Sequence, residues 1–242
     1  MNRALLLLAV GLGVLAALVF YPREIAPSDA PLTPGPLDGA QDTLAFRFIG
    51  NAGIAISDGA TTLLTDLPYE PGAHGYMVYE PEAVRPVGEA VAVITHRHTD
   101  HFSPALFQAR DWFIVGPEEV TLALPSARVL PLLDTVEVGA FRVLPIRTPH
   151  SNTEHYSYLV AWRGVRLFFV GDTEDPSALL ARADLDVVFI TPWLSCIVED
   201  QGATVKAERL VLYHQRPDGS DRMCSGAEVL AQGTGFRLAA RD

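Results

Sequence analysis

Lysine is nearly absent from this chain of 242 residues, in which Lys206 is the only one. Lysine and arginine together number 18, against 29 aspartates and glutamates, and the formal net charge is −11. Proteins that bind phosphate backbones rely on clustered lysine and arginine. The composition therefore excludes nucleic acid from the expected partners.

Cysteine is also scarce, and Cys196 and Cys224 are the only two. In an oxidising compartment they can form one disulfide. Two packed thiols fit the sequence equally well, because it does not give the separation between the two residues. A third and weaker interpretation makes Cys196 a metal ligand.

Charge is missing from one long stretch at the N-terminus, where seventeen uncharged residues, Ala4 to Phe20, follow Met1-Asn2-Arg3. This pattern is typical of an export signal, and the length reaches the lower limit for a membrane-spanning helix. The small-x-small candidate Ser28-Asp29-Ala30 precedes Pro31, a poor processing site. We therefore predict a signal anchor over residues 1–21, with a cleaved signal peptide and a secreted protein as the second choice.

Five prolines follow between residues 22 and 42, which predicts an extended linker. The remaining residues, 43–242, are expected to form one domain in the periplasm or the extracellular space, tethered to the cell membrane. An apolar fraction of 49% is enough for a full core. Beyond the linker there are no low-complexity tracts and no obvious short repeats.

Short apolar segments separated by turn residues run through this domain. Their lengths and composition predict strands, joined by a few short helices. Two sheet-rich halves with interspersed helices predict a sandwich of sheets covered by helices on the outside. Strands are expected over 43–49, 53–57, 61–65, 91–95, 112–115, 135–146, 156–162, 165–170, 185–190 and 209–213, and helices over 103–110 and 175–183.

The segment His96-Arg97-His98-Thr99-Asp100-His101 directly follows the expected strand 91–95. In extended chain alternate side chains share a face, so His96 and His98 can bind one cation. A turn then directs Asp100 and His101 toward a second cation. A histidine-rich tag would lie at a terminus, so the cluster predicts a metal site.

Three further candidate ligands stand where strands end: His150, Asp172 and His214. Such placement gathers side chains at one edge of the sandwich. His155 competes with His150 for the same role, and we favour His150 because it follows the Thr-Pro turn. His74 is expected to be a solvated loop histidine.

The ordered set of seven residues resembles the metallo-β-lactamase superfamily of hydrolases. Residues 48–53 and Leu64-Thr65-Asp66 also resemble the branch that includes ascorbate-phosphate lactonase-like and N-acyl-phosphatidylethanolamine phospholipase D-like enzymes. The resemblance implies an α+β fold, a four-layer αββα sandwich. It assigns His96, His98 and His150 to one metal, Asp100, His101 and His214 to the other, and Asp172 as the bridge.

The implied cofactor is zinc, two Zn²⁺ per chain, with Mn²⁺ or Fe also compatible. Two cations that share a water can supply hydroxide near neutral pH and polarise a scissile carbonyl or phosphoryl oxygen. Asp100 and Asp172 are the expected catalytic carboxylates, and Asp66 and Thr95 are candidates for orienting the imidazoles.

The predicted activity is hydrolysis of an ester, lactone, amide or phosphodiester in a small-molecule or lipid-like substrate. Recognition is expected in the loops 67–84 and 193–203. Two alternatives stay open, a di-iron redox protein and a non-catalytic metal-binding scaffold on the same fold. The oligomeric state is not readable from the sequence.

Overall fold

The computed structural model describes residues 42–241, apart from residues 123, 223 and 225. The predicted signal anchor and almost all of the predicted linker lie outside this range. Within it, no helix is both long and apolar enough to span a membrane.

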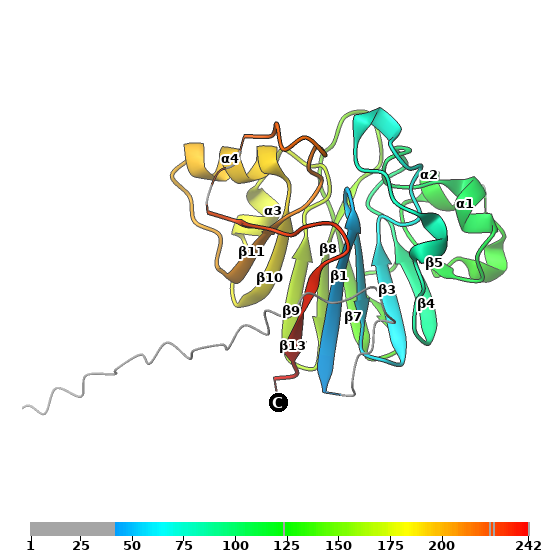
Figure 1. The fold of residues 1–242 in the computed structure, drawn as a ribbon. Coiled ribbons are helices and arrows are strands. Elements are labelled where there is room, and N and C mark those ends of the chain that lie inside the picture. Colours follow the sequence, from blue (N-terminus) through cyan, green and yellow to red (C-terminus); the bar gives the residue numbers. More distant parts are fainter. Residues whose placement is uncertain (1–41, 123, 223, 225, 242) are drawn as a thin grey trace, which may run out of the picture.

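Two β-sheets lie face to face and form the centre of the molecule (Figure 1). The first has the strand order β13-β1-β2-β3-β4-β5, and the second has the order β12-β11-β10-β9-β8-β7-β6. The first sheet contains β1 (Thr43–Gly50), β2 (Gly53–Ser57), β3 (Thr61–Thr65), β4 (Glu89–Val93), β5 (Phe113–Val115) and β13 (Gly235–Ala239). The second contains β6 (Val136–Val138), β7 (Phe141–Arg147), β8 (Tyr156–Trp162), β9 (Val165–Phe169), β10 (Leu185–Ile190), β11 (Ala207–Leu212) and β12 (Glu228–Val229).

The strands of the first sheet bury both of their faces, because alternate side chains point to opposite sides. In β1, Phe46 packs in the core between the sheets, whereas Ala45 packs in a second core on the outer face. Between the sheets, Phe46 stacks on Phe236 with ring centroids 4.5 Å apart, and Phe169 stacks on Phe189 at 4.7 Å.

Helices cover the outer faces of the two sheets (Figure 1). Phe107 of α1 (Pro104–Gln108) and Val120 of α2 (Glu118–Thr121) pack in the core outside the first sheet. The helices α3 (Ser177–Leu180) and α4 (Pro192–Asp200) lie against the second sheet. The predicted four-layer αββα sandwich is confirmed. Short 3₁₀ turns occupy η1 (Ala73–Gly75), η2 (Pro81–Ala83) and η3 (Ser126–Arg128).

The helix α4 corrects one sequence-based expectation. Residues 193–203 were expected to be a recognition loop, but most of them are helical. The Thr191 side chain accepts a hydrogen bond from Leu194 N at 3.4 Å, and Pro192 occupies the first helical position. Both features favour a helix start. The helix expected over 175–183 is shorter than predicted, since only Ser177–Leu180 is helical.

Cys196 and Cys224 form a disulfide, which settles the alternatives left open by the sequence. The interpretation of Cys196 as a metal ligand is therefore wrong, because its sulfur is bonded to another sulfur. The bond joins α4 to the segment that follows β11, across 28 positions in the sequence. A cross-link of this span restricts the unfolded chain and stabilises the fold by about 3 to 4 kcal/mol.

Candidate metal centre

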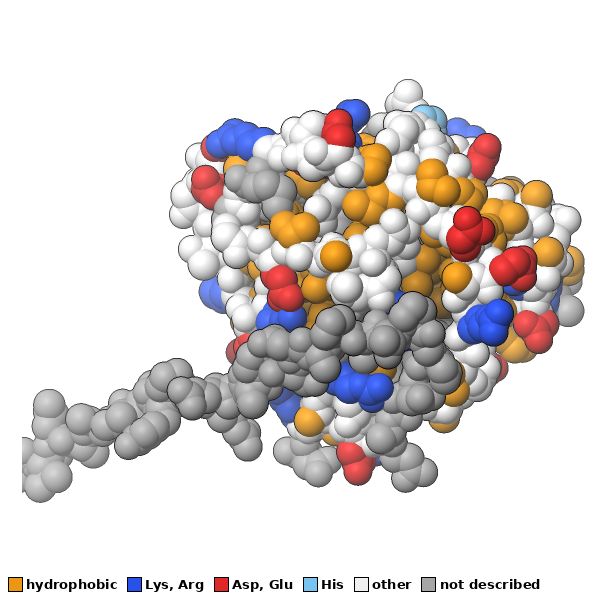
Figure 2. Space-filling model, in the orientation of Figure 1, with side chains coloured by type: hydrophobic (Ala, Val, Ile, Leu, Met, Phe, Trp, Pro, Cys, Tyr) orange, Lys and Arg blue, Asp and Glu red, His pale blue; other side chains and the backbone are white. Residues whose placement is uncertain are grey.

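The seven predicted ligands come together at one edge of the sandwich, although they span positions 96 to 214 in the chain. Residues 96–101 follow β4, and His150 lies in the connection between β7 and β8. Asp172 follows β9 and His214 follows β11. The strands β9, β10 and β11 are parallel, so their carboxyl ends meet at the same edge. Figure 2 shows a histidine side chain on the surface at this end of the molecule.

The first group of ligand atoms consists of imidazole nitrogens from His96, His98 and His150. The Nε2 of His96 is 2.9 Å from Nδ1 of His98, which is 3.4 Å from Nε2 of His150. The three rings come from two segments, and their nitrogens converge on one point. This is the donor set expected for one cation.

The second group combines Asp100, His101, Asp172 and His214, all of them buried. The Nε2 atoms of His101 and His214 are 2.9 Å apart. The Oδ2 atom of Asp100 lies 3.3 Å from Nε2 of His214 and 3.6 Å from Nε2 of His101. These distances place one carboxylate oxygen and two imidazole nitrogens around a second point.

Asp172 connects the two groups through a single oxygen. Its Oδ2 lies 3.2 and 3.3 Å from the Nε2 atoms of His101 and His214. The same oxygen lies 3.9 and 4.0 Å from the Nε2 atoms of His96 and His150. An oxygen in this position can bridge two cations.

The donor set fits a pair of divalent cations. Two imidazole nitrogens 2.9 Å apart can share only one hydrogen, and this arrangement occurs in both groups. A cation instead satisfies both lone pairs. The buried Oδ1 of Asp172 has no hydrogen-bond partner within the described part of the chain, which is costly unless a ligand pairs with it.

Burial and neighbouring charges together set the pKa values of these groups. Burial, and then the charge of His101, lowers the pKa of His96 far below its ordinary value. Burial alone would lower the pKa of His101, but the Asp172 and Asp66 carboxylates raise it well above the ordinary value. Burial alone would raise the pKa of Asp172, but His101 and His214 hold it well below the usual range. The carboxylate thus stays ionised, and positive charge is favoured beside it.

Asp66 and Thr95 orient the imidazoles from behind. The Oδ2 of Asp66 lies 3.1 Å from Nδ1 of His101, and Thr95 Oγ1 lies 2.9 Å from Nδ1 of His96. Thr95 also donates its backbone N–H to Asp66 Oδ1 at 2.7 Å. These contacts engage the Nδ1 atoms, so the Nε2 atoms of both rings face the cluster.

His155 does not join either group, whereas His150 does. The Nε2 of His155 accepts a hydrogen bond from the backbone N–H of Asp172 at 2.9 Å, and its Nδ1 lies 2.8 Å from Thr148 Oγ1. Burial lowers the pKa of His155 to about 3, so it stays neutral and accepts this bond. Glycine at position 171 leaves room for His155, because a Cβ there would lie 2.3 Å from His155 Nε2, and its φ is +65°. His155 therefore positions Asp172.

Some residues that shape the site were not singled out by the sequence. The side chain of Asn51 donates a hydrogen bond from Nδ2 to the backbone oxygen of Asp100 at 2.7 Å. The backbone oxygen of Asn51 accepts one from the backbone N–H of His214 at 2.6 Å. Asn51 adopts a left-handed conformation, with φ 51°, which asparagine tolerates. The segment 48–53 drew attention only through the family resemblance. His74 is exposed, as expected, and its Nε2 lies 3.9 Å from Asp100 Oδ1.

Glu119 in α2 links the loops that carry the first group of ligands. It forms an ion pair with Arg97, which stands between His96 and His98. Its Oε2 accepts a hydrogen bond from Thr153 Oγ1 at 3.1 Å, and its Oε1 accepts one from Glu154 N at 2.9 Å. Thr153 and Glu154 belong to the loop of His150, so one carboxylate holds both loops.

We expect Glu119→Ala to weaken cation binding at the His96, His98 and His150 group by about tenfold, because the loops lose their shared anchor. Competition with a chromophoric chelator measures this affinity. Glu118→Ala is the matched control. Glu118 contacts the loop of His150 through its backbone N–H, which donates to the Glu154 side chain, and the alanine variant keeps this N–H. Equal affinities in the wild type and Glu119→Ala would contradict the expectation.

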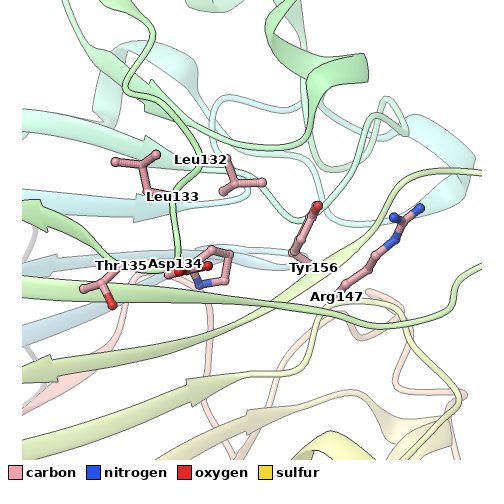
Figure 3. Close-up of a pocket in the computed structure, with 7 residues that line it drawn as sticks. Leu132, Leu133, Asp134, Thr135, Arg147 and Tyr156 are labelled. Carbon is pink, nitrogen blue, oxygen red and sulfur yellow. The ribbon is translucent and has the colours of Figure 1, made fainter.

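A separate cavity of about 590 Å³ lies beside β7 and β8 (Figure 3). It contains none of the seven candidate ligands. Arg147 and Tyr156, at the ends of paired strands, lie on one side, and two leucines lie on the other. The lining residues are Leu132, Leu133, Asp134, Thr135, Pro145, Arg147 and Tyr156.

Comparisons with solved structures identify the architecture. The chain has the metallo-β-lactamase fold, which solved proteins named as metal-dependent hydrolases share. No protein-family model matches the sequence, and no curated protein matches it.

Three similar structures show the range of proteins on this fold. The metallo-beta-lactamase fold protein YhfI from Bacillus subtilis has a TM-score of 0.55 and 15% identity, covering 81% of this chain and 99% of its own. The isothiocyanate hydrolase from Delia radicum gut bacteria has a TM-score of 0.59 and 15% identity, covering 81% and 100%. CmlA, a diiron beta-hydroxylase from Streptomyces venezuelae, has a TM-score of 0.52 and 13% identity, covering 84% of this chain and 55% of its own.

Proposed function

We propose that this protein is a hydrolase that uses two divalent cations, with zinc as the resident metal. One observation carries the proposal: Asp172 Oδ2 lies within 4.0 Å of imidazole nitrogens from both ligand groups. A structural ion needs a closed set of ligands around one point. A carboxylate shared between two adjacent groups is instead the arrangement that suits a pair of catalytic cations.

Two bound cations would polarise the scissile carbonyl or phosphoryl oxygen and lower the pKa of a shared water. His96, His98 and His150 would hold one of them, and Asp100, His101 and His214 the other. Asp172 would keep the two at a fixed separation. Asp100 contacts His101 and His214 through its Oδ2, whereas its Oδ1 lies 3.9 Å from Nε2 of His74. We assign to this oxygen the role of orienting the attacking water and accepting its proton.

The proposed substrate carries an ester, a lactone, an amide or a phosphodiester bond in a small or lipid-like molecule. Five imidazoles and two carboxylates form the donor set. Nitrogen-rich ligation suits zinc, whereas iron sites for oxygen chemistry recruit more carboxylates. The similarity to the diiron protein CmlA makes di-iron redox chemistry the second candidate function.

The test is metal analysis followed by a substrate panel. Zinc, iron and manganese are measured per chain, and the loaded protein is assayed with p-nitrophenyl phosphodiesters, acyl esters, lactones, a chromogenic cephalosporin and an aryl isothiocyanate. We expect about two zinc ions per chain and turnover of at least one class. Bound iron with oxygen-dependent activity would favour the second candidate. Full metal loading without turnover of any class would favour a non-catalytic scaffold.

We also propose that the domain is exported and tethered by the N-terminal apolar segment. The disulfide between Cys196 and Cys224 supports this location, because such bonds persist mainly in oxidising compartments. Mass spectrometry of the native protein, taken without reduction from membrane, periplasmic and cytoplasmic fractions, tests the proposal. Finding the protein in the cytoplasm with both thiols free would overturn it.

A further inference from the structure

Two aromatic side chains from distant segments contact the same ligand, His214. Tyr76, in the loop after η1, lies with its ring centroid 4.2 Å from that of His214, at an interplanar angle of 87°. Trp193, in the first turn of α4, lies 5.0 Å away at 76°. The planes of both rings are therefore nearly perpendicular to the imidazole, next to the second ligand group.

Neither ring is fully buried, although each contacts a buried ligand. Tyr76 and Trp193 are both half-buried, whereas His214 is 1% exposed. The other two tryptophans, Trp112 and Trp162, are buried in the cores and 4% and 1% exposed. A large apolar ring that faces both a buried site and solvent is a common feature of ligand-binding surfaces.

The structure holds both rings in place. Trp193 is one turn before Cys196, which is joined to Cys224 in the segment after β11. Figure 1 shows α4 and that segment together, at the end of the molecule where η1 also lies. On the other side, the Arg216 guanidinium lies 6.0 Å from the centre of the Tyr76 ring. Rings fixed before binding lose little entropy when a substrate packs on them.

We propose that Tyr76 and Trp193 form an aromatic recess beside His214 that selects the substrate. The inference rests on the proposed hydrolase function and names its substrate class: molecules in which the scissile carbonyl or phosphoryl group carries a flat apolar substituent, such as an aromatic ring. The substituent packs against the two rings while the scissile group reaches Asp172. Both residues are specificity determinants and take no part in bond cleavage.

The first test compares two substrates with the same scissile bond, one with a phenyl and one with a methyl substituent, chosen from the class that the wild type hydrolyses. Trp193→Ala should lower kcat/KM for the phenyl substrate about tenfold and for the methyl substrate less than twofold. Val229→Ala is the control, because Val229 on β12 is an apolar side chain outside the recess that is 51% exposed, and both rates should stay within about twofold of the wild type. Equal losses on both substrates in Trp193→Ala would show that Trp193 only covers His214, and would overturn the proposal.

A binding experiment separates failure of the recess from failure of the hydrolase function. The zinc-loaded protein is titrated with benzoate or with acetate while tryptophan fluorescence is recorded. Benzoate should change the emission and acetate should not, because Trp112 and Trp162 are buried in the cores. Trp193→Phe should lose the response. A response to benzoate without any turnover would leave the recess standing and reject the hydrolase, whereas turnover without this response would reject the recess.

Discussion

Asp172→Asn should lower kcat/KM by about 10³-fold or more and reduce the metal content from about two ions per chain to about one. The substitution keeps the shape of the side chain and removes the charge of an oxygen that lies 3.2 to 4.0 Å from four ligand nitrogens. The same change removes one of the two carboxylates that favour positive charge on His101 and on His214, and leaves Asp66 beside the first and Asp100 beside the second. A neutral amide oxygen is a poor bridge between two cations.

Initial rates and elemental analysis of the purified variant measure both effects. Glu174→Gln is the matched control, because Glu174 is an exposed carboxylate two residues further along the same segment. It should retain the activity and the metal content of the wild type. Two ions per chain and wild-type rates in Asp172→Asn would rule out the bridging role.

Removal of the metal with a chelator should abolish hydrolysis and lower the Tm by about 10 °C. Ligands that bind only the folded state stabilise it, by about 4 kcal/mol when the free concentration is a thousand times the Kd. The buried Nε2 atoms of His101 and His214 lie 2.9 Å apart, and Asp172 Oδ1 has no hydrogen-bond partner within the described residues, so bound cations would satisfy these atoms in the folded state. Removal of the metal should therefore lower the stability of the folded state as well as the rate of hydrolysis.

Calorimetry and rate assays before and after chelation measure these changes, and the control is the chelated protein reloaded with zinc. Reloading should restore both the Tm and the rate, and parallel samples with manganese or iron identify the metal that supports turnover. Full activity in a chelated sample shown to be free of metal would refute the metal-dependent mechanism.

Most strands were predictable because their signal is local. Residues 53–57 and 61–65 are short apolar segments around the Asp58-Gly59 turn, and they pair antiparallel as expected. The strand β13 was missed, because Gly235–Ala239 is stabilised by pairing with β1 almost two hundred positions earlier. The helix α4 was also missed, since its start depends on the Thr191 cap and its packing on the second sheet.

The candidate site was predictable to the level of residue type and order. Seven side chains were expected to gather at one edge, and the structure brings all seven together, although their binding of metal stays a prediction. The choice between His150 and His155 depended on contacts that no sequence pattern encodes, such as the hydrogen bond from Asp172 N to His155. Glu119, Tyr76 and Trp193 carry no metal-site signal, because glutamate and aromatic residues are common on any protein surface or core.

The amino-acid sequence by itself determined the chemistry that is available here: closely spaced imidazoles and carboxylates after apolar strands, a shortage of basic residues, and two cysteines. These properties are local, so neighbouring residues encode them. Only the tertiary structure decided which oxygen can bridge two ligand groups, which histidine turns toward them, and which rings stand beside His214. Those distances depend on how two sheets pack and how parallel strands align their ends, and both are set by contacts between residues far apart in the chain.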